Sequence, residues 1–170
     1  MTMILDCIIK AILIFVVYNG IVLHLFGIPK SLSMTFYLLK DSGRHGGWFP
    51  VMMYTMVTFL MPCWLTISEG SDFQFLSFLA CAGILFVGTA PAFKSSSLEN
   101  MVHQVSAYLA AAFSILWIVL VTPYWWIILI AIGVVAFLAI VTKTLKSGLI
   151  YWLEMIAFIS TFSAVLMYAL

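Results

Sequence analysis

Long apolar stretches alternate with short polar connections along the whole chain. A bilayer with hydrocarbon about 30 Å thick needs roughly 20 apolar residues per helix at a rise of about 1.5 Å per residue. The stretches predict six membrane-spanning helices, near residues 4–27, 48–67, 73–92, 100–121, 124–142 and 149–169. The connection at Thr122-Pro123 is so short that the fourth and fifth helices are expected to be antiparallel neighbours. The pattern therefore predicts an all-α fold, with one transmembrane domain over residues 1–170.

The composition supports a membrane protein. Hydrophobic residues make up 65% of the chain, and only seven basic and six acidic residues occur among 170. A soluble domain with so little charge would expose too much apolar surface to stay in solution. The formal net charge of +1 argues against nucleic acid as a partner, because nucleic acid needs a clustered basic face. Membrane lipids are the expected partners.

The basic residues predict how the helices are oriented. Six of the seven fall in the connections after the first, third and fifth helices: Lys30, Lys40, Arg44, Lys94, Lys143 and Lys146. Cytoplasmic loops carry an excess of lysine and arginine, so both termini are expected on the non-cytoplasmic side of a bacterial inner membrane or another plasma membrane. The first stretch contains Asp6 and Lys10 and lacks a signal-peptide cleavage pattern, so it is expected to remain as the first helix.

The first cytoplasmic connection is the longest and contains an apolar segment at residues 31–39. This segment is too apolar for a free loop and too short to span a bilayer. Lys30 and Lys40 flank it, which favours a helix lying at the lipid headgroups. The alternative is a re-entrant segment whose backbone is covered by protein or faces a watery cavity.

Three ionisable side chains lie inside predicted helices, all in the cytoplasmic half of the membrane: His24, His103 and Glu154. Because charge is costly in hydrocarbon, such residues are candidates for function. His103 and Glu154 share helix faces with rows of small residues, which is typical of faces that pack against protein. These rows are Ala107, Ala110, Ala111 and Ser114 beside His103, and Ala157, Thr161 and Ala164 beside Glu154. His24 shares its face with Gly20 and Gly27, so it is also expected to face protein.

The leading hypothesis is a cytoplasm-facing polar cavity among the first, fourth and sixth predicted helices. It would bind a lipid or a small amphipathic ligand, or pass a small solute. The candidate ligand-binding residues are His24, Glu99, His103, Gln104 and Glu154, and the candidate phosphate or headgroup contacts are Lys30, Lys40, Arg44 and Lys94. No catalytic residue, metal or cofactor is assigned, because His-x-x-x-His and Glu-x-x-His pairs are absent.

Three other interpretations stay open. The two histidines and the glutamate could simply hydrogen-bond one another and join three helices. They could serve an intramembrane hydrolase, as acid and base or with a metal. The chain could also be a structural or regulatory subunit whose small-residue faces meet a second copy or another membrane protein. Cys7, Cys63 and Cys81 are expected to pack as small apolar residues, although a bond between the first two is geometrically allowed.

Two segments resemble a known family. One is Pro29 followed by Ser31-Leu32-Ser33-Met34-Thr35, with Trp48-Phe49 opening the second helix. The other contains Gly88-Thr89-Ala90-Pro91, Glu99, Val102-His103 and Ala110-Ala111-Ala112-Phe113. Over about half of the chain these motifs resemble the damage-regulated autophagy modulator-like six-helix membrane proteins and their small bacterial relatives of unknown function. The resemblance implies a compact six-helix bundle with the family's histidine at His103, and it implies no catalytic activity.

Overall fold

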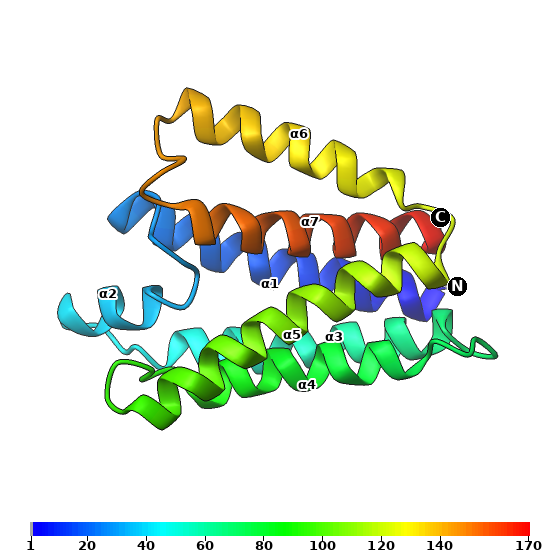
Figure 1. Ribbon diagram of the computed structural model, residues 1–170, viewed down its shortest axis with the longest axis horizontal. Coiled ribbons are helices and arrows are strands. Elements are labelled where there is room, and N and C mark those ends of the chain that lie inside the picture. The colour runs from blue at the N-terminus through cyan, green and yellow to red at the C-terminus, as the bar shows by residue number, and fades with distance from the viewer. Residues whose placement is uncertain (1) are drawn as a thin grey trace.

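The computed structural model describes residues 2–170, and this part of the chain is all-helical (Figure 1). Its seven helices are α1 (Thr2–Phe26), α2 (Thr35–Asp41), α3 (Trp48–Ile67), α4 (Phe75–Thr89), α5 (Ser97–Val121), α6 (Trp126–Val141) and α7 (Leu149–Ala169). The predicted all-α class is confirmed. Four helices, α1, α3, α5 and α7, are long and apolar enough to cross a membrane, as expected of a multi-pass membrane protein.

The other two apolar helices, α4 and α6, are shorter than predicted, with 15 and 16 residues. α4 ends at Thr89 because Ala90 precedes Pro91, and a residue before proline disfavours helical backbone. α6 begins after a turn in which the Tyr124 N–H donates to Thr122 Oγ1 at 3.2 Å. It ends just before Lys143, which adopts a positive φ of 56°. Local backbone chemistry therefore shortens both helices.

The short helix α2 replaces the helix predicted at residues 31–39. It begins later, at Thr35, because Ser31 Oγ accepts the Met34 N–H at 3.2 Å and holds the preceding residues in a turn. The turn is also covered by protein, since Ser31, Leu32 and Ser33 are all buried. The segment thus combines a covered, non-helical part with a short helix.

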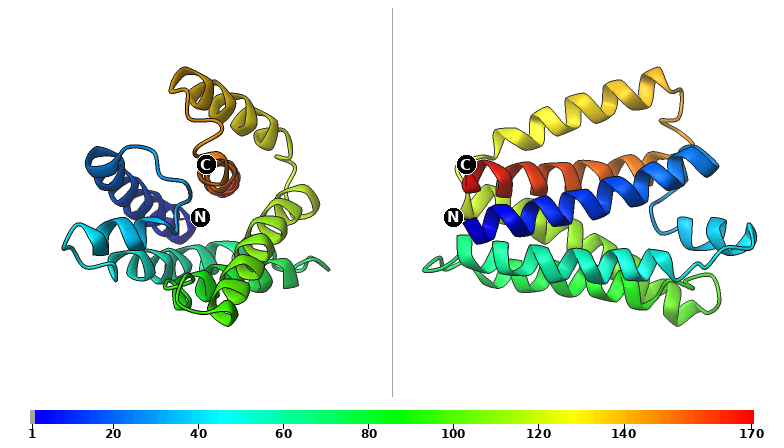
Figure 2. Two further views of the ribbon diagram at one scale, coloured as in Figure 1. Left: turned by 60° about the vertical axis from the view of Figure 1, so that its left-hand side comes forward. Right: turned by 180° about the vertical axis from the view of Figure 1, so that it is seen from behind.

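The long helices run back and forth along one axis, so both termini lie at the same end of the bundle (Figures 1 and 2). α3 packs against α1 and α4, while α5 packs against α4. α7 packs against α1, α5 and α6. α6 packs chiefly on α7 and lies at the edge of the bundle (Figure 2).

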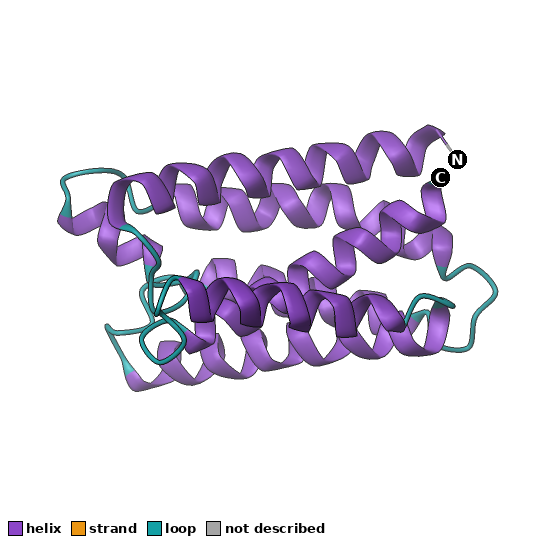
Figure 3. Cartoon of the chain, turned by 90° about the horizontal axis from the view of Figure 1, so that it is seen from above, coloured by secondary structure: helices purple, strands orange, loops and turns teal. Residues whose placement is uncertain are grey.

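The connecting segments gather at the two ends of the bundle (Figure 3). The end opposite the termini holds the segment 27–47 with α2, and the connections 90–96 and 142–148. It therefore carries six basic residues, Lys30, Lys40, Arg44, Lys94, Lys143 and Lys146. We call it the basic end. The seventh basic residue, Lys10, lies in α1.

The core lies between α1, α3, α4, α5 and α7, with fully buried side chains such as Phe49, Leu60 and Trp117. The outer surface is apolar as well. On α6, for example, Leu129, Phe137 and Ile140 are each at least 60% exposed. Exposed apolar surface of this extent fits contact with lipid and not with water.

α4 and α5 approach each other closely at Gly83. A Cβ atom on Gly83 would lie 2.7 Å from the Ala110 N and 2.8 Å from the Ser106 O, so only glycine fits there. His103 and Ser114 on the same helix are buried, and Ala107, Ala110 and Ala111 are half-buried. The prediction that this small-residue row faces protein is confirmed.

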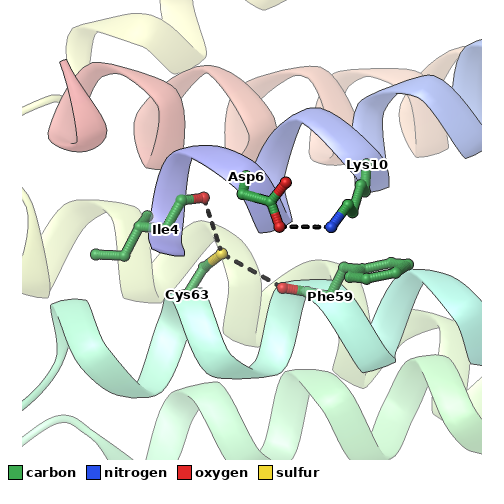
Figure 4. A network of polar contacts seen from close by, with 5 residues as sticks. All are labelled: Ile4, Asp6, Lys10, Phe59 and Cys63. Atoms are coloured by element: carbon green, nitrogen blue, oxygen red, sulfur yellow. Dashed lines mark hydrogen bonds and ion pairs between the residues drawn. The ribbon is translucent and has the colours of Figure 1, made fainter. Parts of the chain in front are cut away.

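Near the end that holds the termini, α1 meets α3 at Cys63 (Figure 4). The Cys63 thiol donates to the Phe59 O at 3.3 Å and the Ile4 O at 3.6 Å, and all three cysteines are free. On the exposed side of α1, Lys10 Nζ pairs with Asp6 Oδ2 at 2.5 Å (Figure 4). The two charges of α1 therefore neutralise each other one helical turn apart.

Candidate functional site

Glu154 holds the buried turn that follows α1. One carboxylate oxygen, Oε2, accepts the Leu32 N–H at 2.6 Å, and the Leu32 side chain is fully buried. One turn earlier on α7, the Tyr151 N–H donates to the Lys30 O at 3.1 Å. A buried backbone N–H needs a partner, and α7 supplies it where the chain turns back into the bundle. Glu154 therefore bonds to backbone and not to a histidine.

Two tyrosines extend this polar contact between helices. The Tyr18 hydroxyl of α1 hydrogen-bonds the Thr35 hydroxyl at the start of α2. The Tyr151 hydroxyl donates to Asn19 Oδ1 at 3.3 Å, which joins α7 to α1. Sequence reasoning missed both contacts. The available signal was a tyrosine inside each predicted span, since a buried hydroxyl needs a partner.

His103 has different partners at the start of α5. Its Nδ1 lies 3.0 Å from the Ala90 O, and its ring stacks on Phe93 with centroids 4.5 Å apart. Because a carbonyl can only accept, Nδ1 carries the proton in this contact. Phe93 packs edge-on against Tyr37 of α2, with ring centroids 5.2 Å apart. His103 thus ties α5 to the connection between α4 and α5.

His24 lies away from both groups. It is exposed, so the prediction that it faces protein is wrong. α1 packs through one row of buried residues: Ile4, Ile8, Ala11, Phe15, Asn19 and Val22. His24 follows Val22 by two positions, so its side chain points about 200° away from this row. His24 is therefore exposed, as is Gly20. The row of α1 that packs against protein contains no glycine.

The remaining predicted ligand-binding residues serve local contacts on α5. Ser96 Oγ accepts the Glu99 N–H at 3.2 Å and caps the helix, while the Glu99 carboxylate accepts from Ser95 Oγ. Gln104 is exposed and donates to Asn100 Oδ1 at 3.1 Å. His24, His103 and Glu154 therefore have separate surroundings. Glu154 and His103 bond to the backbone of Leu32 and Ala90 and not to one another, and no group of three His, Cys, Asp or Glu side chains within residues 2–170 could hold a metal ion.

A partly open cavity of about 60 Å³ lies between α3, α4, α5 and α7. The two predicted small-residue rows face each other across it: Ala107, Ala110, Ala111 and Ser114 on α5, with Ala157 and Thr161 on α7. Glu154 also lies on its wall, but His24, His103 and Gln104 do not. The remaining walls are largely apolar, so this space differs from the predicted polar cavity in both lining and position.

A larger groove of about 560 Å³ lies between α1 and α3, with α2 beside it. Its lining comprises Leu13, Ile14, Val17, Tyr18, Ile21, Val22 and Leu25 of α1, Leu39 of α2, Arg44, and Trp48, Val51, Met52 and Thr55 of α3. From Leu13 to Leu25 it follows α1 for about 18 Å at 1.5 Å per residue. Arg44 carries the sole formal charge of the lining. Sequence reasoning missed this groove, because its walls come from helices that are separated in the chain.

Arg44 differs from the other three predicted headgroup contacts. The Arg44 side chain lies at the groove and forms no ion pair within residues 2–170. Lys94 is occupied by Tyr37: its backbone N–H donates to the Tyr37 hydroxyl at 2.7 Å, and its Nζ lies 4.6 Å from the Tyr37 ring centre. Lys30 and Lys40 are exposed elsewhere at the basic end. The groove therefore joins a long apolar wall to one free guanidinium.

Comparison of the chain with protein-family models, with curated proteins and with solved structures finds no match.

Proposed function

We propose that this membrane protein binds an anionic phospholipid, with an acyl chain along the groove between α1 and α3 and the phosphate at Arg44. The observation that carries the proposal is the Arg44 guanidinium, which forms no ion pair within the described residues and lies at the edge of an apolar groove of about 560 Å³. That volume falls within the range of about 300–1,000 Å³ typical of ligand pockets. An arginine fork matches phosphate oxygens in a bidentate arrangement, which favours an anionic headgroup over a neutral one.

The position of the groove fits a lipid that enters from one leaflet. Arg44 and Trp48 lie at the basic end, whereas Leu13 and Thr55 lie deeper along the bundle. Trp48 is 60% exposed, as is typical of tryptophan at the membrane–water interface. A phosphate at Arg44 would therefore lie at headgroup depth while the chain follows α1 toward the membrane centre.

The proposed topology has six spans, with the basic end in the cytoplasm and both termini on the other side. The clustering of Lys30, Lys40, Arg44, Lys94, Lys143 and Lys146 supports this orientation by the positive-inside rule. α4 and α6, with 15 and 16 residues, are about 22 and 24 Å long at 1.5 Å per residue. They would need local thinning of the bilayer or their flanking turns to complete the crossing. The cytoplasmic leaflet is also the anionic one, which agrees with the proposed lipid.

Native mass spectrometry of the detergent-purified protein tests lipid binding, with phosphatidylglycerol and phosphatidylcholine as probes. The wild-type protein is expected to prefer phosphatidylglycerol. Arg44→Gln is expected to weaken that binding about tenfold, by loss of a charged hydrogen bond. Lys143→Gln is the matched control, since Lys143 is also exposed at the basic end but lies outside the groove. The headgroup assignment would be refuted if the wild-type protein bound phosphatidylglycerol and phosphatidylcholine equally well and if Arg44→Gln left both affinities unchanged.

The acyl-chain part has its own test. Val51→Trp would fill the groove from α3 and is expected to abolish binding of both lipids, while Val119→Trp on the exposed face of α5 should not. If folded Val51→Trp protein still binds phosphatidylglycerol, the lipid binds outside the groove.

Topology is tested separately, with reporter domains fused at the C-terminus and inserted after Lys143. A C-terminal reporter active in the cytoplasm would contradict the proposed orientation.

A further inference from the structure

We infer that the partly open cavity between α3, α4, α5 and α7 is a hydrated site, in which ordered water bonds both Trp64 and Glu154. This inference concerns a different part of the molecule from the lipid groove and does not depend on it. The cavity is lined by Trp64, Ser114, Glu154 and Thr161 among otherwise apolar side chains.

The first observation is an unpaired donor. Trp64 is 1% exposed, and its Nε1–H finds no hydrogen-bond acceptor within residues 2–170. The neighbouring indole behaves differently. Trp117 packs against Trp64 with ring centroids 6.0 Å apart, and its Nε1–H donates to Ser68 Oγ at 2.7 Å. A buried N–H without a partner is costly, so Trp64 requires an acceptor that residues 2–170 do not provide.

The second observation is room beside that donor. A single water needs about 10–15 Å³ of accessible cavity volume, so about 60 Å³ accommodates roughly four waters. A cavity lined only by hydrocarbon would stay dry, and water enters only where several polar partners are present. Size alone would thus not distinguish a hydrated cavity from an empty one.

The third observation is that polar side chains able to hydrogen-bond water line the cavity. Ser114 Oγ donates to the Ala111 O at 2.9 Å, which leaves its lone pairs free to accept. Thr161 adds a hydroxyl about 10 Å along α7 from Glu154, at 1.5 Å per residue. Glu154 uses Oε2 for the Leu32 N–H, and Oε1 forms no hydrogen bond within the described residues. Water can therefore meet donors and acceptors on three helices.

The polar partners also lie at different depths. Glu154 is in the second turn of α7, near the basic end, whereas Trp64 is in the last turn of α3, near the termini (Figure 1). A chain of waters between them would extend along the bundle axis. The ligand class is water, or a solute of that size with a hydroxyl group.

Nuclear magnetic resonance of protein labelled with ¹⁵N-tryptophan tests this inference in detergent micelles. Magnetisation transfer from water to the indole proton is expected at Trp64 and not at the bonded Trp117. Trp64→Phe and Trp117→Phe assign the two signals, and the exposed Trp125 is the positive control. Transfer that is as weak at Trp64 as at Trp117 would refute hydration. A cross-peak from lipid or detergent chains to the Trp64 indole proton would also refute it, since a chain would then occupy the cavity.

A cavity-filling substitution gives a second readout. Ala111→Leu places a larger side chain on the cavity wall and should remove the water signal of Trp64, while Ala112→Leu, on the exposed side of α5, should leave it. A Trp64 water signal that persists in Ala111→Leu would place that water outside the cavity and overturn the inference.

Discussion

The Glu154 carboxylate accepts the Leu32 N–H at 2.6 Å, which ties the start of α7 to a buried turn 122 positions earlier in the chain. This hydrogen bond explains how the non-helical turn can be buried in the bundle. The turn contains a backbone N–H donor that the turn itself does not satisfy, and Glu154 of α7 provides the acceptor. The bond also positions α2, which follows the turn directly and borders the lipid groove.

Removing the Glu154 acceptor should destabilise the protein. Glu154→Ala leaves the Leu32 N–H without a partner and is expected to lower the free energy of unfolding by about 1–3 kcal/mol. Glu154→Gln keeps an oxygen acceptor and should lose less. Thermal unfolding in detergent measures both variants, with Glu69→Ala in an exposed loop as the control. Equal stability of Glu154→Ala and the wild-type protein would show that the turn does not need this bond.

The contact at Gly83 predicts a large effect from one added methyl group. Gly83→Ala would bring a Cβ to 2.7 Å from the Ala110 N, so α4 and α5 must separate, at a cost of about 1–3 kcal/mol typical of overpacking. Gly133→Ala on α6 is the matched control, because a Cβ there meets nothing within 4 Å. It should be neutral or stabilising by up to about 1 kcal/mol, through higher helix propensity. The melting temperature of Gly83→Ala is expected to be lower than that of Gly133→Ala, and the opposite order would contradict the close contact at Gly83.

His103 should control the mobility of the connection between α4 and α5. His103→Ala removes the hydrogen bond to the Ala90 O and the stacking on Phe93, so hydrogen exchange over residues 90–96 is expected to be about tenfold faster. His103→Asn can still place an N–H near the carbonyl and should restore part of the protection. Gln104→Ala, on the exposed side, is the control. Unchanged exchange in His103→Ala would contradict this role.

The pair formed by Asp6 and Lys10 predicts non-additive effects. Either charge alone on the lipid-facing side of α1 is unfavourable, whereas the two neutralise each other. Asp6→Asn and Lys10→Met should each lower the melting temperature, and the double variant should recover most of the loss. A double variant whose loss equals the sum of the two single losses would show that the charges do not interact.

Hydrophobic patterning along the chain was enough to predict the helices and their order. Apolar stretches near 20 residues become helices in hydrocarbon, because only internal hydrogen bonding satisfies the backbone there. The predicted and observed bounds agree fully for residues 48–67 and 149–169. The small-residue row from Ala107 to Ser114 was also predicted to face protein, since only small side chains allow the approach seen at Gly83.

The partners of the polar residues could not be predicted in the same way. Equal depth along the helices suggested that His24, His103 and Glu154 converge, but depth does not specify the rotation of each helix. The buried row of α1 turns His24 outward, and the local connection at Ala90 takes the hydrogen bond of His103. The nearest available partner determined each contact, and for Glu154 it was a backbone N–H from a distant turn.

By itself, then, the sequence determined an all-α chain of long apolar helices, with its basic residues in alternate connections, because these features depend only on local hydrophobicity and charge. The tertiary structure alone decided which faces meet, and with them the groove beside Arg44 and the cavity beside Trp64. Both spaces lie between helices that are separated in the chain. Their shape depends on helix rotation and close packing, which no single segment encodes.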